Sequence, residues 1–360
     1  MTVRGPIAPD ELGTTLVHEH VLTDISNWAH PPQTASEIAM VDKPVVIETL
    51  GDLHRITTLS IDNLKLLDVN DAIAELQNYK VYGGNSLVEV SLPGMARDPV
   101  SLRKISMATG LNIVCGTGWY VESSHPAYVR VKSVDELAAI MIGELTTGIG
   151  NTGVKAGVMG EIGCSYPLTD DERKVLKAVA RAQQKTGAGF TIHPGGIYEQ
   201  EVVGKNEAGR AIKRPVRTIN ECLDLFQKEG ADLSKMYVSH MDLWCSDLEY
   251  SKLLADRYGV TLSYDSFGQE YYSEWIGFPG CGSPHDRERV NALMSLLDAG
   301  LEKQLVVSHD VCEKILLVKY GGWGYAHILK NIIPWLVNEG ATDKQIRAMT
   351  VENPKRLLSY

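Results

Sequence analysis

The sequence predicts a (β/α)8 barrel of the TIM type, and three observations lead to this prediction. Eight short runs rich in β-branched residues recur along the chain. Segments with helical periodicity lie between them, which is typical of parallel βαβ units. Three long excursions each follow the end of a run, where a barrel keeps its active-site loops. An open doubly wound sheet is the alternative that the pattern alone leaves open.

Each run is bounded by turn residues, as expected of a buried parallel strand. The eight expected strands are "TTLVHEH" (14–20), "NSLVEVS" (85–91), "LNIVCGTG" (111–118), "AGVMGEIG" (156–163), "AGFTIHPGG" (188–196), "KMYVSHMD" (235–242), "GVTLSYDS" (259–266) and "QLVVSHD" (304–310).

Five of the intervening segments have a clear helical pattern. Thr169, followed by acidic residues, is a good N-cap, and Gly187 and Gly230 stand where helix C-caps belong. The expected helices cover residues 62–80, 170–185, 216–229, 247–258 and 284–299.

The chain contains no internal repeat, low-complexity tract or linker, so residues 1–360 are expected to form one domain. The three excursions cover residues 28–55, 268–284 and 311–327. The third is rich in glycine and aromatic residues, and we expect it either to line or gate the pocket or to form a packed connection.

The composition excludes several classes of partner. With 35 basic and 45 acidic residues the formal charge is −10, which argues against binding nucleic acid or an anionic membrane. No apolar stretch of 18 residues occurs, so no membrane span is expected. The six cysteines are scattered singly, as is typical of reduced thiols in a cytoplasmic protein.

Two histidines stand close together at the end of the first expected strand. Side chains alternate in a strand, so His18 and His20 share one face and Glu19 points to the other. A lone H-x-H occurs often by chance. Four further residues of metal-ligand type stand near other strand ends: Glu161, His193, His240 and Asp310.

Each of these residues has a structural alternative when taken singly. His193 could be a turn histidine, His240 a buried histidine paired with Asp242, Glu161 a bridge between backbone amides, and Asp310 a helix cap. The joint occurrence of all six at one barrel mouth indicates a metal site instead. His309 should face away from the barrel axis, so we assign it to packing.

The motifs "RGPIAPDELGTTLVHEHV", "GVMGEIGCSYPLT", "TIHPGG", "VSHMD" and "VVSHD" occur in this order. Together with "MTVENPKRLLS" near the C-terminus, they closely resemble the phosphotriesterase family of the amidohydrolase superfamily, and most of all its phosphotriesterase-related branch. The resemblance covers essentially the whole chain. It implies a (β/α)8 barrel with a binuclear metal centre, usually of zinc.

The resemblance also implies a role for each ligand-type residue. His18, His20 and Asp310 would hold the more buried metal, and His193 and His240 the more exposed one. Glu161 would bridge two divalent ions, most simply Zn²⁺, together with a hydroxide. The founding phosphotriesterases have a carboxylated lysine at this place, and Lys155 lies too far from the strand end to substitute.

Two cations that share a hydroxide lower its pKa, and Asp310 can act as general base and then as general acid. The resemblance therefore implies hydrolysis of a phosphoester, phosphonate ester or lactone. An N-acyl amide hydrolase with the same site is the alternative. A mononuclear deaminase and a non-catalytic metal-binding barrel are further alternatives. The expected partners are a small-molecule substrate and, as an open option, a second copy of the chain.

Aromatic and polar residues near the strand ends are expected to wall the pocket, with ordinary packing as the alternative for each. The expected wall residues are Trp119, Tyr120, Tyr264, Asp265, Tyr271, Tyr272 and Trp275. The basic residues near these loops are Arg287, Arg289, Lys314 and Lys319, and the sequence does not show that any of them faces the pocket.

Overall fold

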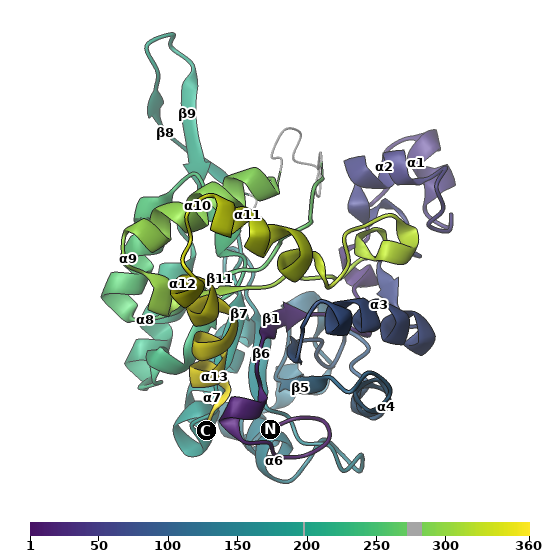
Figure 1. Cartoon of the computed structure of the whole chain (residues 1–360). Helices are drawn as coiled ribbons and strands as arrows, with labels where there is room; N and C mark the ends of the chain where they lie inside the picture. The colour runs from purple at the N-terminus through teal and green to yellow at the C-terminus, as the bar shows by residue number, and fades with distance from the viewer. Residues whose placement is uncertain (197–198, 272–282) are drawn as a thin grey trace.

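The computed structural model describes residues 1–196, 199–271 and 283–360, and eight parallel strands form a nearly closed barrel at its centre (Figure 1). The predicted TIM-barrel fold is confirmed, and each expected run supplies one strand. In their order around the barrel the strands are β1 (Thr15–Glu19), β4 (Ser86–Glu89), β5 (Asn112–Thr117), β6 (Val158–Gly163), β7 (Phe190–His193), β10 (Met236–Val238), β11 (Thr261–Tyr264) and β12 (Leu305–Val307).

The last strand returns to the first. The amide of Asp310 donates a hydrogen bond to the carbonyl of His18 over 3.2 Å, and the amide of His18 donates to the Ser308 hydroxyl over 3.0 Å. These bonds bring the ends of β12 and β1 together, so residues near both ends of the chain contribute to the same mouth of the barrel.

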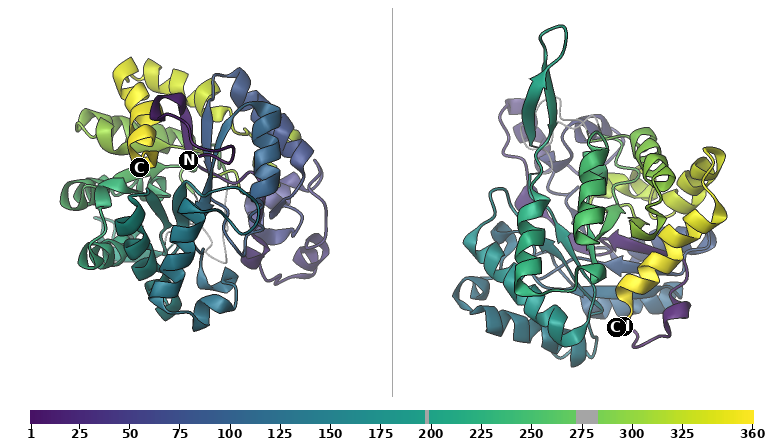
Figure 2. Two further views of the ribbon diagram at one scale, coloured as in Figure 1. Left: turned by 90° about the horizontal axis from the view of Figure 1, so that it is seen from below. Right: turned by 90° about the vertical axis from the view of Figure 1, so that its left-hand side faces the viewer.

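Helices surround the strands when the molecule is seen from below (Figure 2). The longer helices are α3 (Val69–Val81), α4 (Pro99–Thr109), α6 (Val134–Thr146), α7 (Asp170–Thr186), α8 (Ile219–Glu229), α9 (Leu248–Tyr258) and α10 (Asp286–Asp298). The shorter helices are α1 (Ala35–Met40), α2 (Leu50–Arg55), α5 (Tyr128–Val131), α11 (Ile333–Asn338), α12 (Asp343–Arg347) and α13 (Asn353–Leu358).

The ends of α7 agree with the signals in the sequence. Thr169 accepts a hydrogen bond from the amide of Glu172, whose side chain bonds back to the Thr169 amide. Gly187 and Gly230 follow α7 and α8 in the left-handed conformation, at φ +70° and +82°. The predicted start of α3 at residue 62 is wrong. Asp68 caps this helix instead, because its side chain accepts hydrogen bonds from the amides of Asn70 and Asp71.

Apolar side chains from six strands fill the lower part of the barrel. Val17, Val88, Val114, Val158, Tyr237 and Val306 belong to one buried cluster with Leu12, Leu357 and Leu358. Side chains from so many strands can meet only on the barrel axis, and the three leucines come from the two ends of the chain. The barrel is therefore a packed core below and is open to chemistry only at its upper mouth.

Two small antiparallel sheets lie outside the barrel. β2 (Thr23–Asp24) pairs with β3 (Lys65–Leu66). β8 (Gln200–Lys205) pairs with β9 (Ala211–Pro215), and this hairpin projects from the body in Figures 1 and 2. This hairpin is not among the strands expected from the sequence.

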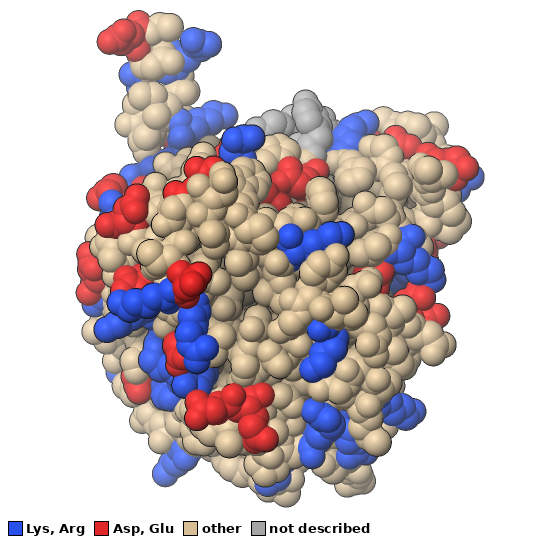
Figure 3. All heavy atoms as spheres, viewed as in Figure 1, with Lys and Arg blue, Asp and Glu red and all other residues tan. Residues whose placement is uncertain are grey.

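The two termini lie close together, and Lys355 is ion-paired with Asp10 over 3.0 Å (Figure 2). Figure 3 shows acidic and basic side chains intermixed over the face that it displays. Across the described ranges, no helix has both the length and the apolar character needed to cross a membrane.

Candidate metal centre and active site

Five strand ends bring six ligand-type side chains to the upper mouth of the barrel. His18 lies in β1 and His20 directly follows it, Glu161 lies in β6, His193 ends β7, and His240 and Asp310 follow β10 and β12. All except Asp310 are buried, and the Asp310 side chain is 15% exposed. The residues that the sequence singled out as a constellation are thus neighbours in space.

Glu161 lies at the centre of this group. Its Oε1 is 3.2 Å from Nε2 of His20, and its Oε2 is 3.2 Å from Nδ1 of His193. The same Oε2 lies 3.5 Å from Nε2 of His18 and 3.6 Å from Nε2 of His240. One carboxylate therefore faces all four imidazoles, which is the arrangement that a ligand shared by two cations requires.

Asp310 faces one side of the group. Its Oδ1 lies 3.3 Å from Nε2 of His20 and 3.6 Å from Nε2 of His18. Two triplets, His18 with His20 and Asp310, and His18 with Glu161 and His240, have ligand atoms within 4.8 Å of one another. Nδ1 of His193 lies 2.9 Å from Nε2 of His240, beside the second triplet. Groups of this kind can hold a metal ion.

A second layer of side chains fixes the imidazoles. Nδ1 of His20 is 2.9 Å from the Ser91 hydroxyl. Asp265 lies behind two rings, with its carboxylate oxygens 2.9 Å from Nδ1 of His240 and 3.2 Å from Nδ1 of His18. When Nδ1 carries the proton in these contacts, Nε2 presents its lone pair to the group, as metal-binding histidines do.

His18 provides a test of whether a cation fits. Its Nε2 is fully buried and has no hydrogen-bond partner among the described residues, although carboxylate oxygens lie at 3.5 and 3.6 Å. A buried polar atom without a partner is costly in a folded protein. A divalent cation bound between these donors would satisfy it, so the residues present fit such an ion.

The electrostatics of the group also favour cations. Burial opposes the ionisation of Glu161, but the surrounding histidines hold the pKa of its carboxyl well below the usual range. Burial likewise opposes a charge on His20, yet hydrogen bonds to Asp310 and Glu161 raise its pKa to about 10. The carboxylates thus increase the affinity of these nitrogens for positive charge, whether it is a proton or a metal ion.

A cavity of about 50 Å³ opens beside the six residues, and its floor includes His20, Glu161, His193, His240 and Asp310. Two of the predicted wall residues, Tyr120 and Tyr271, line it. The remaining wall residues are Ile25, Trp28, Met95, Leu243, Ser266, Gln269, Cys312 and Glu313. None of them was singled out individually from the sequence, but Cys312 and Glu313 belong to the excursion 311–327 that was expected to line the pocket.

Comparison with known proteins decides the family. The model of the phosphotriesterase family matches residues 1–358. The chain belongs to the phosphotriesterase family. Human N-acetyltaurine hydrolase is 35% identical over 364 residues, which cover 100% of this chain and 97% of that protein.

Solved structures agree with this family assignment. A resiniferatoxin-binding protein from Rhodobacter sphaeroides is 34% identical with a TM-score of 0.91, covering 100% of this chain and 94% of its own. A phosphotriesterase homology protein from Escherichia coli, solved with phosphate in its active site, is 26% identical with a TM-score of 0.74. The match covers 97% of this chain and 100% of that protein. The chain is accordingly a hydrolase of the phosphotriesterase family.

Within this phosphotriesterase-family barrel, three predicted wall residues lie elsewhere. Trp119 is packed in the core, where its ring N–H donates to the Tyr128 hydroxyl over 3.1 Å. Tyr264, the last residue of β11, is fully buried and points to the opposite side from Asp265, which directly follows it. Asp265 supports the histidines from behind. Tyr272 and Trp275 lie outside the described residues.

The basic candidates do not line the cavity either. The Arg289 side chain is fully buried and bonds Asp242 and Asp286. The others lie against neighbours outside the cavity: Arg287 over the Trp335 ring, Lys314 beside Asp62 and Lys319 beside Asp71. His309 is likewise structural, with Nδ1 2.8 Å from Glu19. Of the excursion 311–327, Cys312 and Glu313 reach the cavity.

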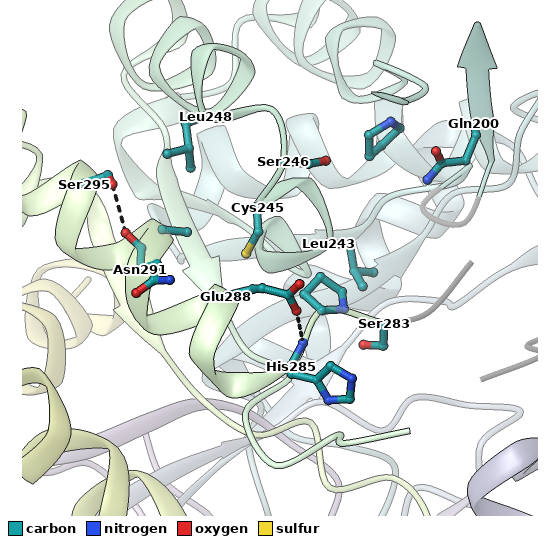
Figure 4. Close-up of a pocket in the computed structure, with 13 residues that line it drawn as sticks. Gln200, Leu243, Cys245, Ser246, Leu248, Ser283, His285, Glu288, Asn291 and Ser295 are labelled. Atoms are coloured by element: carbon teal, nitrogen blue, oxygen red, sulfur yellow. Dashed lines mark hydrogen bonds between the residues drawn. The ribbon is translucent and has the colours of Figure 1, made fainter. Parts of the chain in front are cut away.

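A larger cavity of about 560 Å³ lies on the other side of Leu243. Figure 4 shows Leu243 among its lining residues, with Gln200 from β8, Leu248 from α9 and Asn291 from α10. Leu243 is 7% exposed and lines both cavities. It therefore forms part of the wall between the site and a wider hollow at the base of the hairpin.

Proposed function

We propose that this chain hydrolyses the amide bond of a small N-acyl amine with the help of two divalent cations. The observation that carries the proposal is the group of five donors around the sixth, Glu161, in a chain that matches N-acetyltaurine hydrolases over its full length. The relatives favour an amide over the phosphoester, phosphonate ester or lactone that the motifs first indicated.

In this proposal His18, His20 and Asp310 would hold one cation, His193 and His240 would hold the other, and Glu161 would be a ligand of both. Imidazole nitrogen and carboxylate oxygen together favour zinc. When bound, the cations supply an acidified water and polarise the carbonyl of the substrate. Asp265 orients His18 and His240 through their Nδ1 atoms.

Asp310 has the chemistry that an amide substrate needs most. Its Oδ1 faces His18 and His20, so Oδ2 is the oxygen left to accept a proton from the attacking water. An amine leaves an amide only after its nitrogen has been protonated. Asp310 returns the proton to that nitrogen, acting first as general base and then as general acid.

The test compares the activity of the zinc-loaded protein on four small substrates. These are an N-acetyl alkylamine, an acetate ester, a five-membered lactone and a phosphotriester, with the released amine, acid or alcohol measured directly. We expect the amide to be hydrolysed, and Asp310→Asn to lower kcat on it by about 100- to 10,000-fold. Asp135→Asn is the matched control, since the Asp135 side chain is 84% exposed.

Cleavage of the ester, lactone or phosphotriester with no amide turned over would replace the proposed substrate class. An Asp310→Asn protein that keeps its metal and near wild-type kcat on the amide would remove Asp310 from proton transfer.

A further inference from the structure

The charges that line the active-site cavity are unusual for a site that receives an anion. Its described lining includes three carboxyl groups, from Glu161, Asp310 and Glu313, and neither lysine nor arginine. The segments 197–198 and 272–282, whose structure is not described, also contain neither residue in their sequence. A sulfonate or carboxylate on the substrate would therefore have no basic side chain of the cavity wall to pair with.

Glu313 is the carboxyl group that the proposed mechanism does not use. It is 2% exposed and lines the cavity three residues after Asp310. The hydroxyl of Tyr271 donates a hydrogen bond to its Oε2 over 2.9 Å, and the side chains of Thr57 and Asn63 bond it as well. These contacts fix the carboxyl group in one orientation beside the substrate space.

The raised pKa of Glu313 makes its ionisation sensitive to a charged partner. Burial raises the pKa of its carboxyl to about 7, against the lowering effect of its hydrogen bonds. A cation placed beside it would stabilise the ionised form and be stabilised in return. Glu161 and Asp310 are committed to the proposed metal ions, which leaves Glu313 to face the rest of the substrate.

Aromatic rings complete the wall. Trp28, Tyr120 and Tyr271 all line the cavity, and the rings of Trp28 and Tyr120 lie 6.3 Å apart at 65°. The faces of such rings attract cations and not anions. Away from the proposed metal ions, an anion buried among these rings and carboxyl groups would lose its hydration without a positively charged partner, which is strongly unfavourable.

We infer that the amine half of the substrate carries a positive charge, so that the enzyme cleaves N-acyl derivatives of short diamines, with Glu313 binding the free ammonium group. This inference rests on the proposed amide hydrolysis and names the substrate class of the same site. The inferred substrate differs in charge from N-acetyltaurine, for which the relatives are named, because the amine half of N-acetyltaurine carries a sulfonate group.

The experiment uses four acetamides, CH3CO–NH–CH2CH2–X, in which X is ammonium, hydroxyl, carboxylate or sulfonate. The amide and the spacer are constant, so only the charge of the amine half changes. We expect kcat/KM of the zinc-loaded enzyme to be highest for ammonium and lowest for sulfonate, with about tenfold or more between them, as one charge-assisted hydrogen bond provides.

Glu313→Gln keeps the shape of the side chain and removes its charge. The ratio of kcat/KM for the ammonium member over the hydroxyl member should fall about tenfold. Glu249→Gln is the matched control, because the Glu249 side chain is 80% exposed. Tyr271→Phe removes one hydrogen bond that orients Glu313 and should lower the same ratio by a smaller factor. It serves as the second variant if Glu313→Gln does not fold.

The outcomes are distinguishable. Preference for ammonium together with a reduced ratio in the variants supports the inference. Highest activity on the sulfonate or carboxylate, or an unchanged ratio in both variants, overturns it while amide hydrolysis stands. No hydrolysis of any of the four amides by the metal-loaded enzyme overturns the proposed function itself, and the inference with it.

Discussion

The side-chain amide of Gln269 donates a hydrogen bond to Oδ2 of Asp310 over 3.2 Å. The same nitrogen lies 3.1 Å from the carbonyl oxygen of Asp310 and 3.3 Å from that of His309. Arg289 in turn donates to the carbonyl of Gln269 over 3.4 Å. Gln269 thus holds the carboxylate of Asp310 so that Oδ1 faces the histidines and Oδ2 faces the cavity. The backbone of Asp310 itself is in the left-handed region, at φ +52°.

Gln269→Met keeps the length of this side chain but removes its N–H donors. We expect kcat on an alkyl amide to fall about tenfold, because one positioning hydrogen bond is worth about 1 kcal/mol or somewhat more. A substrate with a nitroanilide leaving group should be less affected, since its nitrogen needs less proton donation. Steady-state kinetics on the two amides, with metal content measured in parallel, provide the check. Equal losses on both would assign Gln269 a merely structural role.

The ligand assignments predict different consequences for two variants. Glu161→Ala should weaken the binding of both cations, because this carboxylate lies between the two groups of histidines. His193→Ala should weaken mainly one. Elemental analysis of protein loaded with excess zinc and then dialysed against metal-free buffer should give two ions per chain for wild type and for the surface control Glu249→Ala. Wild-type protein with a single ion at full occupancy would contradict the two-cation proposal.

Leu243 is predicted to limit the length of the acyl group. Leu243→Ala should join the cavity of about 50 Å³ to the neighbouring one of about 560 Å³. The kcat/KM for an N-hexanoyl amide relative to the N-acetyl amide should then rise several-fold, at a cost in folding free energy of about 2–5 kcal/mol. Leu248→Ala opens only the outer cavity and is the matched control. An unchanged preference for acetyl in Leu243→Ala would show that the acyl group points elsewhere.

The raised pKa of the buried Glu89 carboxyl leads us to expect that the stability of the protein depends on pH. Burial raises the pKa of its carboxyl from 4.5 to about 7, so the folded protein retains a proton that the unfolded chain loses. This contribution to stability is complete below pH 4.5 and is lost as pH rises through 7. It amounts to roughly 3 kcal/mol at 1.36 kcal/mol per pK unit.

Glu89→Gln stays neutral at every pH. Its melting temperature, relative to that of wild type, should therefore be higher at pH 8 than at pH 5. Thermal unfolding of the two proteins across this range measures the difference, with Glu249→Gln as control. A constant difference between wild type and Glu89→Gln at all pH values would show that Glu89 is not the titrating group.

The strands and the meeting of six ligand-type side chains at one barrel mouth could be predicted because both depend on short-range patterns. His18 and His20 share a face through strand alternation, and Glu161 and Asp310 stand at the ends of apolar runs. The pocket wall could not be predicted in this way. Trp28 reaches the cavity from the end of a short 3-10 helix (Ser26–Trp28), and its position depends on contacts with Tyr120 and His193, which are distant in sequence.

Two further misses have similar causes. Tyr264 was expected in the wall, but the neighbouring Asp265 faces the histidines, so the tyrosine must point away from them. The hairpin of β8 and β9 has little burial to shape its sequence, since most of its residues are exposed or half-buried. Its alternation of apolar and charged residues is therefore weak, and no helical or strand period stands out.

Glu19 connects the beginning of the chain to its end. Its carboxylate accepts hydrogen bonds from the Ser308 hydroxyl and from the amides of His309 and Val311, the second of these 290 residues further along the chain. On a ribosome, which releases the polypeptide from its N-terminus, these donors emerge 289 to 292 residues after Glu19 itself. A product truncated before residue 308 lacks these three donors to the Glu19 carboxylate. It also lacks the contacts that bring the end of β12 to β1. We expect such a fragment to be unfolded and inactive, and not to be a weaker enzyme.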